Sequence, residues 1–512
     1  MKFIYHRFES LPKLAWCASV EKGTGEVHVY HGSWLEPRKE FFVEGAWDGS
    51  FEEGNFEHAY LMGSGGKIVD NEVVFCTACH TSERIHYIIL DDVFFISPSL
   101  CFLLTFTNNK LDYNYISYHS DLKKMCSGID EHVGAIPCKG NVKINICHYR
   151  NIRIDSNLNI EINVKNINAP AFNNYNEYKA FLTNRLEHLA KNACDESRNI
   201  QYLPISTISS GYDSPACSII AKSIGCKEAV TFKDARGEED KPQGSDSGKP
   251  IADILGISVR EFDRKAYLNK AGFPEAEFVA SGDMGQDFHL CAFEEEWQQR
   301  LVFLGNHGWD AWNRFRSKKA LNIPLYRIDF EADSYIDFKF RVGFISCHLP
   351  FIGSLNRKSL YKITNSAEMK PYWLWTNYDR PIARRIIEEA GVPRSLFGQK
   401  KKATSVLLNR DKNLGKYMNA ESYKSFEDYY RNNIKSRNRI KQYYFNLMFA
   451  LYLSNTWITN KFNGIFDKFN IKLSVDPIIS NKYSEPPGLP SFLVYWGIEM
   501  IQNRYKIINN KN

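Results

Sequence analysis

The sequence predicts an α/β protein in which a mostly β N-terminal domain precedes a domain built around a parallel sheet. Two observations support this prediction. Short β-branched runs separated by turns fill the first third of the chain, and apolar strands alternate with amphipathic helices in its middle. A length of 512 residues allows more than one hydrophobic core. We expect domains over residues 1–168 and 169–410, followed by a helical C-terminal extension over residues 411–512.

The first third of the chain is rich in short predicted strands and poor in helical periods. Residues 25–30, 72–77 and 86–90 form apolar and β-branched runs bounded by turn residues. Such runs are typical of strands that pair into sheets. The sequence therefore predicts a layered, mostly β domain at this end.

The most informative segment covers residues 208–215. A β-branched strand is predicted over residues 202–208 and a helix over residues 216–224. The small residues between them let backbone N–H groups approach a polyanion, and the helix directs its positive end to the same place. Asp213 would repel bare phosphate, so its presence favours a bridging Mg²⁺. The candidate binding residues of this loop are Ser209, Ser210, Gly211, Asp213 and Ser214.

Strands and helices continue to alternate along the middle of the chain. An amphipathic helix is predicted over residues 174–190, a strand over 227–232, a helix over 246–257 and a strand over 259–262. This alternation is what a parallel sheet requires. The charged, glycine-containing segment 234–245 is expected to be a flap and not a core element.

The run over residues 301–312 repeats the pattern of an apolar strand, a glycine-rich turn and an acid. Its Gly305 and Gly308 belong to the turn, and Asp310 is the candidate for a second Mg²⁺ ligand. His307 has two interpretations, a general base or a histidine that caps the turn, and both stay open.

A third segment, residues 378–394, contains a helix that ends at Gly391 and leads into a basic loop. The loop contains Lys400, Lys401 and Lys402. By itself a lysine run is most often a solvated surface or a nucleic-acid patch. Its position after this helix matters only in combination with the preceding segments.

From about residue 170 to 410, the order of these segments resembles the asparagine synthetase family of the PP-loop ATP pyrophosphatases. The first loop is similar to the family's SGGxDS signature, with Ser210 in place of the first glycine. The resemblance implies ATP and Mg²⁺ as cofactors, with Asp213 and Asp310 holding the metal. The residues implied in nucleotide binding are Ser209, Gly211, Ser214, Thr231, Phe232, Asp246, Gly305 and Gly308.

The resemblance also assigns a role to the basic loop. In this family a lysine after the corresponding helix touches the α-phosphate, and Lys400 is the matching residue. Lys401 and Lys402 are alternatives if the register is shifted. The expected role is neutralisation of the charge that develops during the reaction.

Several positions depart from the family pattern. Asn306 stands where the family has a glutamate and where the β-lactam synthetases have a tyrosine that helps to deprotonate the amine. An asparagine cannot accept a proton near neutral pH, so either His307 is the base or the amine arrives neutral. Ala311 replaces a second acid, Ser346 replaces an acid and His348 an arginine, so we expect a different amine pocket.

The N-terminal end also differs from the glutamine-dependent members of the family. Their glutaminase nucleophile is a cysteine at the mature N-terminus, whereas here Lys2 follows Met1 and Cys17 lies too far along. The resemblance therefore favours a degenerate Ntn-hydrolase-like domain without glutamine hydrolysis. Members of that branch include β-lactam synthetase, carbapenam synthetase and the lasso-peptide cyclases.

These observations lead to a functional expectation. The chain is expected to be a ligase that adenylates a carboxylate of a small molecule or peptide, releases pyrophosphate and passes the acyl group to an amine. The candidate catalytic residues are Lys400, His307 and Asn306. Two alternatives stay open: an ammonia-using amidotransferase and a non-catalytic ATP-binding scaffold.

Composition bears on nucleic-acid binding, membrane insertion and disulfide formation. A formal net charge of +6 is small for this length, so nucleic acid is not implied as a partner. No run is long and apolar enough to span a bilayer, and the N-terminus lacks an apolar signal core, so we expect a cytoplasmic protein. The twelve cysteines are expected to be mostly buried thiols. Whether the chain forms a homo-oligomer is left open, and residues 443–453 are predicted to be helical.

Overall fold

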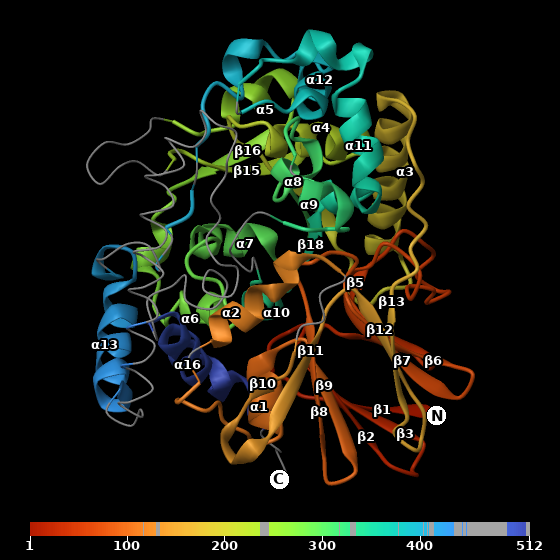
Figure 1. Ribbon diagram of the computed structural model, residues 1–512, viewed down its shortest axis with the longest axis vertical. Coiled ribbons are helices and arrows are strands. Elements are labelled where there is room, and N and C mark those ends of the chain that lie inside the picture. The colour runs from red at the N-terminus through yellow and green to blue at the C-terminus, as the bar shows by residue number, and fades with distance from the viewer. Residues whose placement is uncertain are drawn as a thin grey trace.

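The computed structural model is a mixed α/β molecule with three sheets. Figure 1 shows a β-rich half, coloured red to orange, below a half in which helices surround a second set of strands. The described residues are 1–115, 117–129, 134–235, 245–316, 318–327, 334–376, 378–402, 404–406, 408, 414–434, 443, 447 and 489–507.

Two stacked sheets form the N-terminal half. Their strands are β1 (Lys2–Arg7), β2 (Trp16–Glu21), β3 (Glu26–His31), β4 (Glu36–Pro37), β5 (Phe41–Ala46), β6 (Met62–Val69), β7 (Glu72–Cys76), β8 (Ile85–Leu90), β9 (Val93–Ser97), β10 (Ile136–Pro137), β11 (Lys143–Cys147), β12 (Arg150–Ile154) and β13 (Ile160–Val164). One sheet has the order β1-β3-β2-β9-β8-β11-β10 and the other β13-β12-β7-β6-β5-β4. β1 and β3 pair in parallel, and the other neighbours pair antiparallel.

Aromatic side chains fill the space between these two sheets. The Trp16 ring on β2 packs edge-on against Phe42 on β5, with ring centroids 5.0 Å apart. Phe75 on β7 stacks with Phe94 on β9 at 6.1 Å. Because large aromatic rings bury much apolar area, they account for much of the stability of such a core. The three strands predicted from sequence here correspond to β3, β7 and β8.

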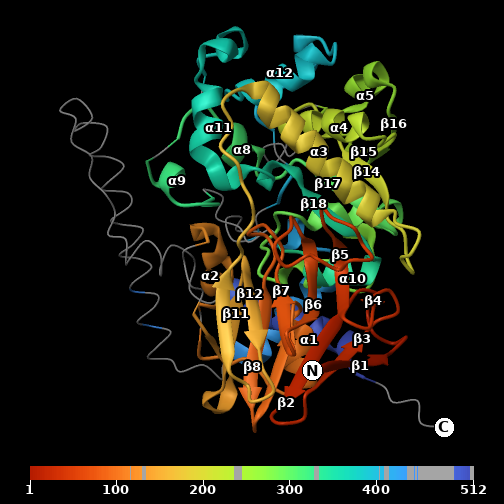
Figure 2. The same ribbon diagram turned by 90° about the vertical axis from the view of Figure 1, so that its right-hand side faces the viewer.

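A five-stranded parallel sheet forms the second half, seen from the side in Figure 2. Its strands are β14 (Leu203–Thr207), β15 (Glu228–Phe232), β16 (Ser258–Phe262), β17 (Arg300–Leu304) and β18 (Ile345–His348). Their order is β16-β15-β14-β17-β18, and every neighbouring pair is parallel. The chain builds outward from β14 to β16 and then returns to place β17 on the other side of β14. The strand order therefore reverses between β14 and β17, where open parallel sheets bind their ligands.

Helices cover this sheet much as the sequence predicts. The main ones are α3 (Tyr175–Ala193), α4 (Asp213–Ser223), α5 (Lys249–Leu255), α8 (Gly308–Trp312), α11 (Arg357–Thr364) and α12 (Pro381–Glu389). α3 begins after Asn174, whose side chain accepts the backbone N–H of Glu177 at 3.0 Å and so satisfies a free helix donor. α4 begins at Asp213, before its predicted start at residue 216, because Tyr212 already has a right-handed helical backbone. The candidate metal ligand is therefore the first residue of a helix.

The remaining described helices include those of the C-terminal segment. They are α1 (Leu100–Phe106), α2 (Tyr118–Leu122), α6 (Ala276–Val279), α7 (Glu294–Trp297), α9 (Lys318–Asn322), α10 (Ile336–Val342), α13 (Ala420–Ile434) and α16 (Leu489–Ile501). α16 packs against α6, α2 and α13, as Figure 1 shows at its lower left. The Trp496 indole donates to the Ser425 hydroxyl at 3.0 Å and joins α16 to α13. The C-terminal extension thus contacts both halves.

Two sequence predictions fall outside the described residues. They are most of the predicted flap, at residues 236–244, and the predicted helix over residues 443–453 apart from Tyr443 and Leu447.

The cysteines are mostly buried thiols, as the sequence predicts. All twelve cysteines are free thiols, and eleven are buried while Cys194 is half-buried. Among the described helices, none combines the length and the apolar character needed to cross a bilayer.

Candidate active site

A cavity of about 310 Å³ opens where the strand order reverses, at the carboxyl ends of β14 and β17. Segments far apart in the chain meet around it: the loop after β14, the end of β15, residues 286–293, the loop after β17, and residues 378–405. Among the residues predicted from sequence, those that line it are Ser209, Gly211, Asp213, Ser214, Thr231, Phe232, Asp246, Gly305, Asn306 and His307. Ser210, Gly308, Asp310 and Lys400 are not in its lining.

The loop after β14 is held by its own small side chains. The Ser209 and Ser214 hydroxyls are 2.8 Å apart, and the Gly211 N–H donates to the Ser209 hydroxyl at 3.2 Å. No side-chain hydrogen bond caps the start of α4 within the described structure. The first N–H groups of a helix and its dipole attract anions. This end of the cavity therefore suits a phosphate group.

Glycines in the loop after β17 let it lie against the start of α4. A Cβ on Gly308 would sit 2.3 Å from the Asp213 carboxyl carbon, and one on Gly305 would sit 2.6 Å from the Ser214 backbone nitrogen. Any larger residue would push the two loops apart. Both glycines predicted from sequence thus allow the two loops to pack closely. Gly308 contacts the Asp213 side chain but does not line the cavity.

Asp213 is one of three described carboxylates that line the cavity. One of its oxygens forms an ion pair with Arg380, and the other, Oδ1, is buried without a hydrogen-bond partner in the described structure. A buried carboxylate oxygen without a donor is costly unless a ligand supplies one. Mg²⁺ is usually held by one or two carboxylates together with phosphate oxygens and water. Asp213 therefore fits a cation that a nucleotide helps to bind.

Asp310 does not join Asp213 in the cavity lining. Its Oδ1 is 3.4 Å from an Arg316 nitrogen, and both side chains are 2 % exposed. Arg316 also donates to the Trp309 carbonyl at 2.5 Å. A buried guanidinium thus pairs with this carboxylate, and the role of Asp310 as a second metal ligand stays a prediction. In the part of the chain that is described, no group of three or more His, Cys, Asp or Glu side chains is arranged to hold a metal.

An aromatic recess lies at the other end of the cavity, beside β15. The Phe232 ring stacks on Phe293 with centroids 4.3 Å apart and meets His289 edge-on at 5.0 Å. Burial lowers the pKa of His289 to about 3, so its ring is neutral. The Thr231 hydroxyl accepts the Gly248 N–H at 2.9 Å, which fixes the end of the strand. Flat apolar walls of this kind suit a planar aromatic base.

Asp246 and Ser210 form a supporting pair beside the phosphate end. The Ser210 hydroxyl donates to Asp246 at 2.7 Å, and the Ser210 N–H donates to the Asp246 carbonyl at 3.0 Å. Burial raises the pKa of Asp246 from its usual value, although the Ser210 hydrogen bond opposes this shift. Ser210 thus holds the loop after β14 to the start of the next helix without facing the cavity.

The basic loop lies across the cavity and is fixed at several points. The Gly398 N–H donates to the Ser210 carbonyl at 2.8 Å, and Arg394 donates to the Tyr212 hydroxyl at 2.8 Å. Further along, the Val406 N–H donates to the Gly285 carbonyl at 2.9 Å. These hydrogen bonds fix the position of the basic loop relative to the rest of the domain.

These anchors decide which lysines of the basic loop face the cavity. The exposed Lys401 and the half-buried Lys402 line it, whereas Lys400, also exposed, lies outside the lining. The structure thus favours the two register alternatives over Lys400. Lys402 donates to the Ser210 hydroxyl at 3.2 Å, and the Lys401 ammonium lies 5.1 Å from the centre of the Trp309 ring.

His307 and Asn306 occupy the side of the cavity that faces the N-terminal half. His307 has a left-handed backbone with φ of 69°, and its Nε2 lies 3.2 Å from the Ser82 hydroxyl and 3.4 Å from an Arg327 nitrogen. A guanidinium at Nε2 competes with a proton for that nitrogen. Asn306 is half-buried in the lining beside it.

Two other departures from the family pattern lie behind this wall. The Ser346 hydroxyl donates to Glu83 at 3.2 Å, and His348 Nε2 is 3.1 Å from the Tyr335 hydroxyl. Both side chains are buried at the boundary between the halves. In the N-terminal half, Cys17 is fully buried on β2, and burial raises the pKa of its thiol. A thiol in that position is not available as a nucleophile.

Several residues of the lining have no role predicted from the sequence, notably Arg380, Gln286, Asp287 and His289. A signal existed for the first, because Arg380 directly precedes Pro381, the first residue of a helix. For the others the signal is the glycine- and aspartate-rich run 281–287, in which Asp283 accepts the N–H groups of Gly285 and Gln286, each at 2.7 Å.

Known proteins add no independent identification of this site. No protein-family model matches the chain, and no curated protein matches it at a significant level.

Proposed function

We propose that this protein is an ATP-dependent ligase that adenylates a substrate carboxylate and transfers the acyl group to an amine. The proposal rests on the cavity at the carboxyl ends of β14 and β17. This cavity combines an aromatic recess, an uncapped helix start and three cationic side chains, Arg380, Lys401 and Lys402. The first suits a nucleobase and the other two suit its phosphates. The resemblance to the asparagine synthetase family supplies the reaction class.

The reaction has two steps. A carboxylate oxygen of the substrate attacks the α-phosphorus, the bond from that phosphorus to the pyrophosphate oxygen breaks, and acyl-adenylate and pyrophosphate form. The amine nitrogen then attacks the acyl carbon, the bond to the AMP oxygen breaks, and the nitrogen loses a proton. Ser209, Gly211 and Ser214 position the pyrophosphate end, while Lys401 and Lys402 neutralise charge at the α-phosphate.

Asp213 is the residue that would hold a divalent cation in this reaction. A cation at its Oδ1 would neutralise phosphate charge as the leaving pyrophosphate forms. The proton of the amine needs an acceptor, for which His307 is the nearest titratable side chain in the lining on this side. The alternative is an amine that arrives neutral, and His307 Nε2 already faces the Arg327 guanidinium at 3.4 Å.

One alternative has a specific observation in its favour. Asp310 is paired with Arg316 and Lys400 is exposed, which is the arrangement expected if catalysis has been lost and nucleotide binding kept. An ammonia-using amidotransferase would share the nucleotide residues and differ in the amine pocket.

The test is to incubate the purified protein with Mg²⁺-ATP and a panel of amino acids and peptides, and to measure AMP and pyrophosphate. The matched control is Asp213→Asn, which keeps the volume of the side chain and removes its charge. Substrate-dependent pyrophosphate from the wild type alone supports the ligase. ATP binding without pyrophosphate favours the scaffold, and ammonia as the effective amine favours the amidotransferase.

A further inference from the structure

Arg380 is a cationic side chain of the cavity that the two reaction steps leave without a role. It lies directly before α12, is 4 % exposed, and forms an ion pair with Asp213. Its guanidinium lies 5.4 Å from the centre of the Trp309 ring and 5.1 Å from that of Tyr378, both of which also line the cavity. Arg380 is therefore packed between aromatic rings at the phosphate end.

The Arg380–Asp213 pair is incompletely bonded on both sides. Within the described structure, Arg380 Nε and Asp213 Oδ1 are each buried without a hydrogen-bond partner. Burial of two charges is repaid only when their remaining donors and acceptors are also satisfied. The pair is thus well placed to exchange its partners for a ligand that offers both a cation and anionic oxygens.

Charge in the cavity points to the same exchange. The described carboxylates of the lining are Asp213, Asp246 and Asp287, and the described lysines and arginines are Arg380, Lys401 and Lys402. The lining is balanced when no ligand is bound. A divalent cation at Asp213 would repel the adjacent guanidinium, and a phosphate would attract it.

We propose that Arg380 is a phosphate-binding residue that Asp213 holds until a divalent cation takes its place. The inference rests on the proposed nucleotide site and adds that its cation and its nucleotide bind together. Arg380 competes with the cation for Asp213 in the free protein, and it binds the β- and γ-phosphates once nucleotide and cation arrive together. Cation and nucleotide therefore bind with positive coupling.

Arg380→Gln tests this with two measurements that should change in opposite directions. Mn²⁺ binding to the nucleotide-free protein, followed by electron paramagnetic resonance, should become several-fold tighter because the competing guanidinium is gone. Calorimetric binding of α,β-methylene-ATP with saturating Mg²⁺ should become about tenfold weaker, since a charged hydrogen-bonded partner of the phosphate is lost. AMP binding should not change.

The matched control is Arg384→Gln, which removes a charge from the same helix at a side chain that pairs with Glu388 at 2.6 Å outside the lining. Neither measurement should change in this variant. If Arg380→Gln does not fold, Arg380→Lys carries the same test: it keeps the competing charge, so Mn²⁺ binding stays as in the wild type, while nucleotide binding weakens because the bidentate fork is lost.

Three outcomes overturn the inference. Equal weakening of Mn²⁺ and nucleotide binding would assign Arg380 a purely structural role, and unchanged values for both would leave it no role at the site. Absence of nucleotide binding by the wild type would overturn the proposed function itself, and it is distinguished from the other two because it is seen before any substitution is made.

Discussion

Two carboxylates, the buried Asp337 and the half-buried Asp213, show opposite ways of using charge. Asp337 on α10 accepts hydrogen bonds from Ser99 and Tyr505, each at 2.5 Å, and from Ser281 at 3.0 Å. Asp213 has a single ion pair and a buried oxygen without a partner in the described structure. The first carboxylate is satisfied by the fold, whereas the second is left for a ligand.

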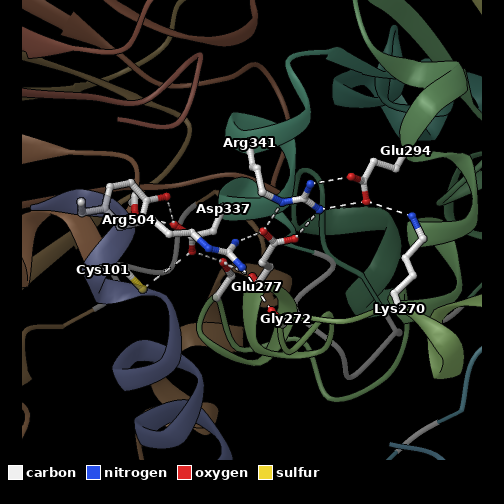
Figure 3. Close-up of polar contacts among 11 residues, drawn as sticks. Cys101, Lys270, Gly272, Glu277, Glu294, Asp337, Arg341 and Arg504 are labelled. Carbon is white, nitrogen blue, oxygen red and sulfur yellow. Dashed lines mark hydrogen bonds and ion pairs between the residues drawn. The ribbon is translucent and has the colours of Figure 1, made fainter. Parts of the chain in front are cut away.

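The surroundings of Asp337 explain its structural role. Its partners come from the N-terminal half, the parallel-sheet half and the C-terminal segment, so one carboxylate ties all three together. Figure 3 shows the adjoining network, in which Arg341 lies between Glu277 and Glu294, and Arg504 reaches Glu277 from the C-terminal segment. A carboxylate bonded in this way has no capacity left for a cation, which is why buried acids have to be judged by their partners.

The largest effect is expected from Asp213→Asn. Loss of the charge on Asp213, whose Oδ1 is buried without a partner in the described structure, should lower the rate of pyrophosphate formation by about 1,000-fold. Stability should change little, because the side chain already borders the cavity. Initial rates at saturating Mg²⁺-ATP measure the effect, and a rate within tenfold of wild type would contradict the contrast with Asp337.

Asp337→Ala should instead lower the stability of the protein and leave nucleotide binding unchanged. Three buried hydroxyl donors lose their acceptor, so the free energy of unfolding should fall by about 3 kcal/mol. Nucleotide affinity in the folded fraction should stay as in the wild type. Urea unfolding followed by tryptophan fluorescence gives the first quantity. Asp337→Asn keeps an acceptor and should cost about 1 kcal/mol, and equal costs for both variants would count against this reading.

A smaller effect separates the lysines of the basic loop. Lys401→Gln and Lys402→Gln should each raise the Kd for Mg²⁺-ATP by about tenfold, because both line the cavity. Lys400→Gln, at the position matched by the resemblance, should change the Kd by less than about twofold, because Lys400 lies outside the lining and solvent screens its charge from the phosphates. One calorimetric series measures all three Kd values. A larger effect at Lys400 than at Lys401 and Lys402 would support Lys400 as the lysine that contacts the α-phosphate.

The smallest effect is a pH dependence within the network around Arg341. Burial opposes ionisation of Glu294, but Arg341 and Lys270 outweigh it and lower the pKa of this carboxyl to about 2. A lowered folded-state pKa contributes stability above the unfolded value, and this is lost as pH falls from about 4.5 towards 2. Because the group is partly exposed, the contribution should be at most about 1 kcal/mol. Melting temperatures between pH 5 and 3 should fall more for the wild type than for Glu294→Gln.

Local pattern was sufficient for most elements around the cavity. The strands β14, β15, β16 and β17 lie within a residue or two of their predicted bounds, because each is an apolar run bounded by turn residues. The start of α4 was missed by a few residues, since Pro215 is compatible with a first helical turn as well as with a loop. The residue pattern predicted both glycines in the turn after β17. Gly305 lies there, whereas Gly308 is the first residue of α8, and the pattern could not show that both pack against the start of α4.

Local sequence patterns could not predict which charged side chains pair with one another. The pairing of Asp310 with Arg316 depends on how α8 lies relative to the chain that follows it, and the exposure of Lys400 depends on anchors at Gly398 and Val406. Arg380 lies far from Asp213 in sequence, and only the packing of α12 on α4 brings them into contact. Contacts of this kind depend on long-range geometry that no local window contains.

The sequence by itself determined the alternation of strands and helices and the small-residue loop after β14 with its acid, because these follow from periodicity and turn chemistry. The tertiary structure alone decided which charged groups face the cavity. An acid or lysine becomes a ligand or a structural residue according to whether the surrounding fold supplies its hydrogen bonds, and burial makes that difference large in free energy.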